Sequence, residues 1–323
     1  MHIAVRIFFC VFLFSGGCRD QGSSLKVHRE LNADLPDKYL IVLGIAQDGG
    51  FPQIGCEKAC CTDHWKGREV KKNVSSLALV DRKSGSYWII EATPDIGQQL
   101  KFLQDHMGQE SFRLPEGIFI SHAHIGHYAG LMYLGREAFG AQNIPVHAMP
   151  RMDSFLRTNG PWSQLVTTGN ISLKRMKEDS AIRLGDAFKI SPFRVPHRDE
   201  YSETVGFRIE GPNKTILFIP DIDKWEKWKL DIRHEVQKVD FAFLDGTFFK
   251  EDELPGRDMR EIPHPLISES LTAFSDLPAT EKKKIVFIHF NHTNPLLKRS
   301  SAEKDSVVSK GFGVAHEGMV TGL

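Results

Sequence analysis

The chain has 323 residues, in which 41 Lys and Arg residues balance 41 Asp and Glu residues, so the formal net charge is zero. This balance gives no reason to expect a nucleic-acid partner, because nucleic acids are normally bound through an excess of basic side chains. The shares of hydrophobic (41%) and charged (25%) residues are those of an ordinary globular protein.

The start of the chain has its own pattern. "MHIAVRIFFCVFLFSGG", residues 1–17, begins weakly basic, continues through an apolar run and ends in small residues directly before Cys18. This layout is typical of a secretory signal peptide and is too short for a membrane-spanning helix. The small residues before Cys18 also resemble a bacterial lipoprotein cleavage site. We predict a signal peptide at 1–18 and a polar linker at 19–37. We expect export, with lipid attachment through Cys18 on the periplasmic or cell-surface side of a membrane; plain secretion or membrane retention is the alternative.

Strand-like and helical segments alternate through the rest of the chain, residues 38–323. Apolar, β-rich runs predict strands at 38–46, 75–81, 87–92, 117–124, 144–149, 188–197, 204–211, 214–223, 239–249 and 283–295. Helical spacing of apolar residues predicts helices at 94–107, 128–139 and 264–277. The alternation predicts an α/β domain with two β-sheets covered by helices.

Metal-binding residue types follow several of these strands. Strand ends are where α/β folds usually build their sites. The stretch "SHAHIGH" after the strand at 117 places three imidazoles within six positions. The candidates for an active-site metal centre are His122, His124, His127, His197, Asp221 and His289. Imidazoles with a carboxylate suit zinc, manganese or iron, so we expect one or two such ions and a small-molecule substrate.

The order of these residues, His-x-His-x-x-His followed by His, Asp and His, resembles the metallo-β-lactamase superfamily. The resemblance implies an αββα sandwich with the metal site at one edge. It assigns the ligands in order: His122, His124 and His197 to the first ion, Asp221 to a bridging position, and His127 and His289 to the second ion. Gly126 stands where the family usually has an Asp ligand. We therefore expect one well-held ion, with the second weak or absent.

Four further stretches resemble the pyrroloquinoline quinone (PQQ) biosynthesis protein B branch of this superfamily: "GGFPQIGC", "EATPDIGQQL", "LDGTFFKEDE" and "FIHFNHTNPLL". The same region is similar to the cyclic phosphodiesterases of the carbon–phosphorus lyase pathway. Glu91 stands where the PQQ biosynthesis protein B branch commonly has Asp. That branch also often lacks the first histidines, which this chain keeps.

A cysteine cluster predicts a second, structural metal. "CEKACC" supplies Cys56, Cys60 and Cys61, and His64 follows three residues later. Three thiolates and one imidazole are a common closed zinc set. The related phosphodiesterases take the fourth ligand three positions after the last active-site histidine, which favours His292 over His64.

Three functions fit the sequence. The first is a hydrolase, in which a metal-activated water attacks an ester or phosphodiester, with Asp221 and His264 as catalytic residues. The second is an iron-dependent oxidation of a cofactor precursor, as the PQQ biosynthesis protein B resemblance implies. The third is a non-catalytic, metal-retaining lipoprotein. We expect Asp245 to orient a ligand imidazole through a hydrogen bond. Asp95 is expected at the N-terminus of a helix. Trp162 is expected to form an apolar wall of the substrate site, in a loop at 158–166.

Overall fold

The computed structural model describes residues 35–323. The predicted signal peptide, Cys18 and most of the predicted linker lie outside the described residues. Within residues 35–323, no helix is both long and apolar enough to cross a membrane.

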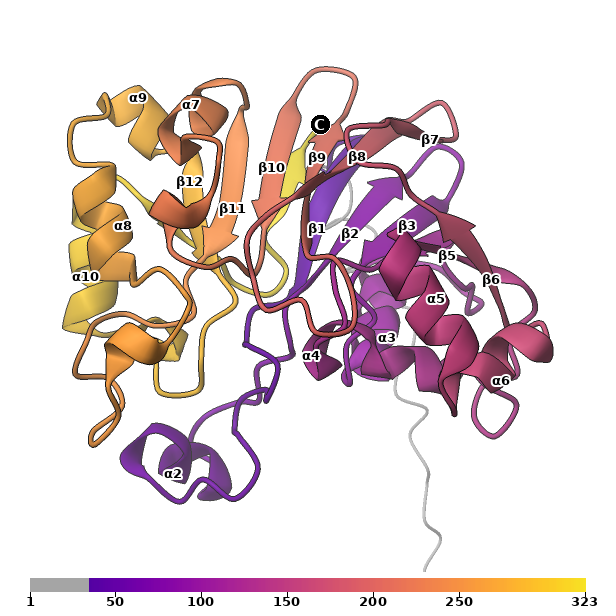
Figure 1. Ribbon diagram of the computed structural model, residues 1–323, viewed down its shortest axis with the longest axis horizontal. Helices are drawn as coiled ribbons and strands as arrows, with labels where there is room; N and C mark the ends of the chain where they lie inside the picture. Colours follow the sequence, from indigo (N-terminus) through magenta and orange to yellow (C-terminus); the bar gives the residue numbers. More distant parts are fainter. Residues whose placement is uncertain (1–34) are drawn as a thin grey trace, which may run out of the picture. The chain divides into compact units, whose positions relative to one another are not determined.

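Two mixed β-sheets of seven strands each form the centre of the domain (Figure 1). The first has the order β14-β1-β2-β3-β4-β5-β6 and the second β13-β12-β11-β10-β9-β8-β7. The first sheet's strands are β1 (Lys38–Gly44), β2 (Ser76–Asp81), β3 (Ser86–Ile90), β4 (Gly117–Phe119), β5 (Ile144–Ala148), β6 (Ile171–Arg175) and β14 (Val320–Gly322). The second sheet's strands are β7 (Ile182–Leu184), β8 (Phe188–Arg194), β9 (Val205–Glu210), β10 (Thr215–Ile219), β11 (Phe241–Asp245), β12 (Ile285–Ile288) and β13 (Gly313–Val314).

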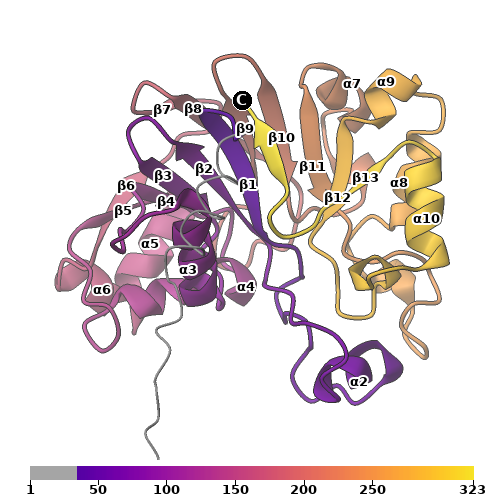
Figure 2. The same ribbon diagram turned by 180° about the vertical axis from the view of Figure 1, so that it is seen from behind.

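Helices cover the outer faces of both sheets, so the predicted two-sheet α/β architecture is confirmed (Figures 1 and 2). The α-helices are α2 (Ala59–Trp65), α3 (Ile96–Met107), α4 (Ile125–Tyr128), α5 (Pro150–Thr158), α6 (Trp162–Thr167), α7 (Ile232–Gln237), α8 (Ile267–Ala273), α9 (Ala279–Lys282) and α10 (Ala302–Ser309). The 3₁₀ turns are η1 (Ala129–Leu134), η2 (Trp225–Lys227), η3 (Met259–Glu261) and η4 (Pro295–Leu297). Helix α2 stands apart from the sheets in both views.

The position of strand β1 between two cores explains its continuous apolar sequence. Successive side chains of a strand point to opposite faces. Leu40 and Val42 join the large core that includes both sheets, whereas Tyr39 and Ile41 join the core beneath helix α3. Because both faces are buried, the strand needs an unbroken apolar run.

Parallel pairing then gathers the site residues. Strands β10, β11 and β12 pair in parallel, as do β3 and β4. The carboxyl ends of parallel strands meet at one edge of a sheet, which is where ligand sites of open α/β sheets form. Asp221, Asp245 and His289 come at or just after the ends of the first three strands.

The segment predicted as a helix at 128–139 is different in the structure. It continues helix α4 for one residue and then forms the 3₁₀ turn η1 and irregular turns. The amide of Gly130 donates to the carbonyl of Ala92 at 2.8 Å, and Gly130 packs so closely on this backbone that a Cβ would not fit. This docking of the turn on the chain after β3 replaces a regular helix. The strand predicted to run to 124 likewise ends at Phe119, and the histidine stretch follows as a loop.

Candidate metal centre

Two groups of buried and half-buried imidazoles and carboxylates lie together near the strand ends. The first group is His122, His124, His197 and Asp221, and the second is Asp48, His127, Asp221 and His289. In each group the potential ligand atoms lie within 4.8 Å of one another. The structure thus brings together all six predicted active-site residues, and Asp221 belongs to both groups.

The distances around Asp221 show how closely the groups approach. Its Oδ2 lies 3.4 Å from Nε2 of His122 and 3.8 Å from Nε2 of His127. Its Oδ1 lies 3.2 Å from Nε2 of His197 and 3.0 Å from Nδ1 of His264. The side chain is only 2% exposed, so one buried carboxylate faces both groups.

Three of the imidazoles are oriented by contacts at the ring nitrogen that faces away from the centre. Nδ1 of His122 meets the Ser121 hydroxyl at 2.8 Å, and Nδ1 of His289 meets the Thr247 hydroxyl at 3.0 Å. In the same way, Nδ1 of His197 meets Oδ1 of Asp223 at 3.2 Å. Fixing one ring nitrogen orients the other, which is how proteins position histidine ligands of metals.

The ring nitrogens that face the centre lack partners. Among residues 35–323, no hydrogen-bond partner is found for the buried Nε2 atoms of His122, His127, His197 and His289, nor for Oδ1 of Asp48 and Asp221. An unpaired buried polar atom is costly, so such a cluster needs a common partner. A divalent cation is that partner for nitrogen and carboxylate donors. We conclude that these residues form a metal-binding site.

Asp48 is the site residue that the sequence analysis missed. It lies in the loop after β1, and its Oδ1 is 3.0 Å from Nε2 of His127. Like the predicted ligands, it follows an apolar strand, and this was the signal that could have found it. The Gly-rich context "QDGGFP" instead made the segment look like a simple turn.

Opposite charges dominate the ionisation of the centre. Burial alone would lower the pKa of His197, but Asp221 and Asp223 outweigh burial and raise it to about 9. Burial alone would raise the pKa of Asp48, but the imidazoles of His127 and His289 hold it well below its usual range. The low pKa of Asp48 favours the carboxylate form that binds a cation, and a cation bound by His197 would compete with a proton for its ring nitrogen.

His264, predicted as a catalytic residue, is buried beside the centre. It is 8% exposed, and its Nδ1 lies 2.9 Å from Oδ2 of Asp245. Burial alone would lower its pKa, but Asp221 and Asp245 raise it well above the usual value. Asp245, predicted to fix a ligand imidazole, instead pairs with His264 and accepts bonds from the Thr247 amide and hydroxyl.

Glu91 lies behind the second group. It is fully buried, and its Oε1 lies 3.5 Å from Nδ1 of His127. Both Glu91 and His289 have positive φ angles, of 75° and 67°. Non-glycine residues adopt such angles at a cost, and they do so mostly where a site needs them.

The cysteine cluster lies at the start of α2. Cys56, Cys60, Cys61 and His292 form one group whose ligand atoms lie within 4.8 Å of one another, and Sγ of Cys56 is 3.5 Å from Sγ of Cys60. His292, not His64, completes the group. Burial and the neighbouring thiols raise the pKa of Cys61 to about 12. A bound cation reverses this effect by stabilising the thiolates.

Two other predicted residues have structural positions. Asp95 is the residue before helix α3, as expected, but its side chain caps nothing; Oδ2 accepts from the Val74 amide at 2.9 Å. Trp162 begins helix α6, where a loop was expected, and packs against the rings of Tyr128 and Phe155. It is therefore part of the packed periphery.

Comparison with known proteins shows which family the chain belongs to. The family described as "Beta-lactamase superfamily domain" matches residues 87–290, well over half of the chain. The chain belongs to this superfamily. Within the superfamily it is similar to "Coenzyme PQQ synthesis protein B" of Methylobacterium nodulans, with 27% identity over 309 residues that cover 88% of this chain and 99% of that protein. The expected resemblance to that branch is therefore confirmed.

Solved structures agree on the fold of this superfamily member. The Zn²⁺-bound PqqB from Methylobacterium extorquens superposes with a TM-score of 0.74 at 23% identity, covering 88% of this chain and all of that chain. A diphosphatase from the PhnP family gives a TM-score of 0.61 at 22% identity, covering 88% and 96%. At these identities the likeness shows the fold alone. The names of the curated relatives favour the quinone-cofactor alternative over the general hydrolase that was the first expectation.

Proposed function

We propose that the protein is a metal-dependent enzyme of the PQQ synthesis protein B type, which uses iron and dioxygen to oxidise a small anionic cofactor precursor. The observation that carries this proposal is the full-length similarity to PQQ synthesis protein B, which extends over 99% of that relative. The similarity therefore includes the loops that form the site as well as the shared sheets. Imidazole and carboxylate ligands together also suit non-haem iron.

A pocket beside the centre supports an anionic substrate. It has a volume of about 440 Å³, and His264, Thr247, Arg198 and Arg257 are among its lining residues. In the described part of the chain neither guanidinium is in an ion pair. Arginine binds carboxylate and phosphate groups in bidentate fashion. The two arginines are therefore available for an acidic substrate.

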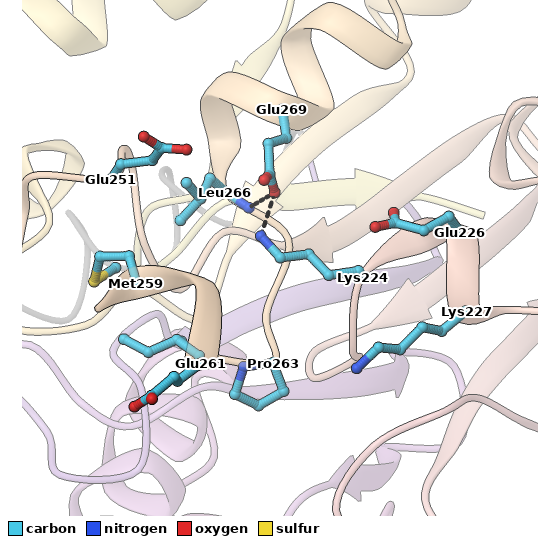
Figure 3. A pocket seen from close by; sticks show the side chains of 10 residues that line it. Lys224, Glu226, Lys227, Glu251, Met259, Glu261, Pro263, Leu266 and Glu269 are labelled. Atoms are coloured by element: carbon cyan, nitrogen blue, oxygen red, sulfur yellow. Dashed lines mark hydrogen bonds and ion pairs between the residues drawn. The ribbon is translucent and has the colours of Figure 1, made fainter. Parts of the chain in front are cut away.

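A neighbouring hollow is less suited to this role. It has a volume of about 330 Å³, and its wall includes the ion pair between Lys224 and Glu269, 2.6 Å apart (Figure 3). Glu269 also accepts from the amide of Leu266 at 2.8 Å. Lys224 is therefore already paired, and Glu226, Glu251 and Glu261, which also line this hollow, repel an anion. We assign the substrate to the pocket with Arg198 and Arg257.

In this proposal Asp221, His264 and Asp245 have different roles. A bound ion would supply Lewis-acid activation of water or, as iron, of dioxygen. Asp221 would hold the ion, and His264, which contacts Asp221 and lines the pocket, would hold or donate a proton next to the substrate. Asp245 keeps His264 in that orientation.

Hydrolysis is the second candidate, and one observation favours it. The group of His122, His124, His197 and Asp221 has three imidazoles and one carboxylate, which suits an ion that activates water. In that case the substrate would be an ester or phosphodiester carrying negative charge.

Metal analysis of protein purified without added metal tests the two candidates. Iron in the preparation, with dioxygen consumption when a quinone-cofactor precursor is added, supports the first. Zinc or manganese with turnover of bis(p-nitrophenyl) phosphate and no dioxygen consumption overturns it in favour of hydrolysis. His124→Ala should abolish whichever activity is found; unchanged activity would leave only a non-catalytic role.

The group of Cys56, Cys60, Cys61 and His292 we assign to structural zinc. Three thiolates and one imidazole leave no open position at a tetrahedral ion, which is the arrangement of structural sites. Mass spectrometry under native conditions should find one zinc ion that survives removal of the active-site metal by a mild chelator.

A further inference from the structure

We propose that Asp48 is a ligand of a second active-site ion, replacing the Asp that superfamily relatives carry at the position of Gly126. The inference concerns how many ions the centre holds, so it stands whichever of the two proposed reactions takes place. It reverses the expectation that Gly126 leaves the second ion weak or absent.

The donor atoms around Asp48 have the spacing of a coordination shell. Oδ1 of Asp48 lies 3.0 Å from Nε2 of His127 and 3.6 Å from Nε2 of His289. Nε2 of His127 lies 3.8 Å from Oδ2 of Asp221. Ligands at about 2.0–2.1 Å from a tetrahedral ion are about 3.3 Å apart, close to the first two distances.

Burial argues against a simple ion pair at this position. The His127 and His289 side chains are fully buried and the Asp48 side chain is 16% exposed. Although Asp48 and His127 are close, Oδ1 and Nε2 do not meet in hydrogen-bonding geometry, and both lack a partner within residues 35–323. Two buried atoms that approach without bonding to each other are expected when both bind a third atom.

Gly126 is what allows Asp48 to be there. A Cβ added to Gly126 would lie 2.5 Å from Cα and 2.8 Å from Cβ of Asp48, which is too close for any real contact. A side chain at 126 and the present position of Asp48 therefore exclude each other. The carboxylate reaches the same space from the loop after β1 instead of from the histidine loop.

Backbone hydrogen bonds fix the Asp48 loop beside His289. The Gln47 amide donates to the Phe290 carbonyl at 2.8 Å, and the Phe290 amide donates to the Ile45 carbonyl at 2.8 Å. The Gly50 amide donates to the Gln47 carbonyl at 2.7 Å and closes the turn. Asp48 is thus anchored to the residue that follows His289, which makes it a preorganised donor.

The test counts zinc ions in protein stripped of metal and then titrated with Zn²⁺, with calorimetry for affinity and elemental analysis for number. Asp48→Ala and Asp48→Asn should each lose one ion per chain, or weaken its binding by about 100-fold or more, because even indirect partners of ligands contribute 10–100-fold. The matched control is Glu200→Gln, since Glu200 lies 3.8 Å from His124 but is outside both groups. This control should bind as many ions as the wild type.

A positional exchange keeps the test independent of folding defects. Gly126→Asp alone should destabilise the protein because of the close approach to Asp48. Asp48→Gly with Gly126→Asp should restore the lost ion, since the glycines at 49 and 50 let the loop move away. Unchanged ion number and affinity in Asp48→Ala, or a double variant that folds but does not regain the ion, would overturn the proposal. These outcomes are read from metal binding alone, so they differ from a failure to find either activity.

Discussion

At the scale of single residues, Asp221 is the carboxylate shared by both groups, so its removal should affect the whole centre. His122 belongs only to the first group and His289 only to the second. We expect Asp221→Ala to lose both active-site ions, whereas His122→Ala and His289→Ala should each lose one. Zinc stoichiometry of the three purified variants checks this pattern. Equal losses in all three would mean that the two groups do not act as separate sites.

Arg198 should govern substrate binding more than chemistry. It lines the pocket beside His264 without a described ion-pair partner. A hydrogen bond to a charged group contributes about 1.5–3 kcal/mol, so Arg198→Ala should raise KM by roughly 10- to 100-fold. The metal content should not change. Steady-state kinetics with the active substrate measures the effect, with Arg183→Ala on edge strand β7 as the control. A fall in kcat with constant KM would contradict a binding role.

The residue scale also shows the limit of sequence reasoning. His122, His124 and His127 are recognisable because three imidazoles fall within one loop. Asp48 has no such neighbours, and its importance depends on the long-range bonds that tie its loop to Phe290. An isolated acid in a glycine-rich loop gives no sign of which distant histidines it will meet.

At the scale of elements, the strands could be predicted better than the short helices. Buried strands such as β1 carry continuous apolar runs that depend only on their own residues. The turn η1 and helix α6 depend on tertiary contacts, such as Gly130 against Ala92 and Trp162 against Tyr128, that local periodicity does not contain. Their boundaries were therefore wrong even where the surrounding order of elements was right.

Strand β5 carries a histidine whose burial makes stability depend on pH. Burial, with a smaller contribution from Lys174, lowers the pKa of His147 to about 4, and its ring stacks on Phe119 at 4.3 Å between centroids. With an unfolded pKa near 6.5, the unfolded chain binds more protons between pH 6.5 and 4. Stability is therefore full above pH 6.5 and falls as the pH decreases toward 4, by about 3 kcal/mol from this residue.

His147→Phe keeps an aromatic ring on Phe119 but cannot be protonated. We expect the free energy of unfolding of the variant to fall less between pH 7 and pH 4.5 than that of the wild type. Urea denaturation of both proteins at the two pH values measures the loss of unfolding free energy in each. Effects of acid on the metal sites are common to both proteins and cancel when the two losses are subtracted. Parallel pH profiles for the two proteins would show that His147 is protonated in the folded state without cost.

At the scale of the whole molecule, the cysteine site and the active centre are joined by two short chain segments. The loop that carries Asp48 leads directly to Cys56, and the loop that carries His289 leads directly to His292. An ion bound by the cysteines and His292 would therefore hold together the two segments that supply Asp48 and His289 to the second group. The first group has no such link, because His122, His124 and His197 come from other loops.

This connection predicts that loss of the ion proposed at the cysteine site affects the two groups of the active centre unequally. In Cys60→Ser, the second active-site ion should bind about 10- to 100-fold more weakly, the range for residues that position ligands indirectly. The first ion should be affected much less. Thr62→Ala, in the same helix α2 but outside the cysteine group, is the matched control. Calorimetric titration with Zn²⁺ separates the ions by affinity. We expect selective weakening of the second ion because, of the residues in the two groups, Asp48 and His289 are the ones that adjoin the cysteine site along the chain. Equal weakening of both active-site ions in Cys60→Ser would contradict this and would mean that the cysteine site stabilises the fold in general.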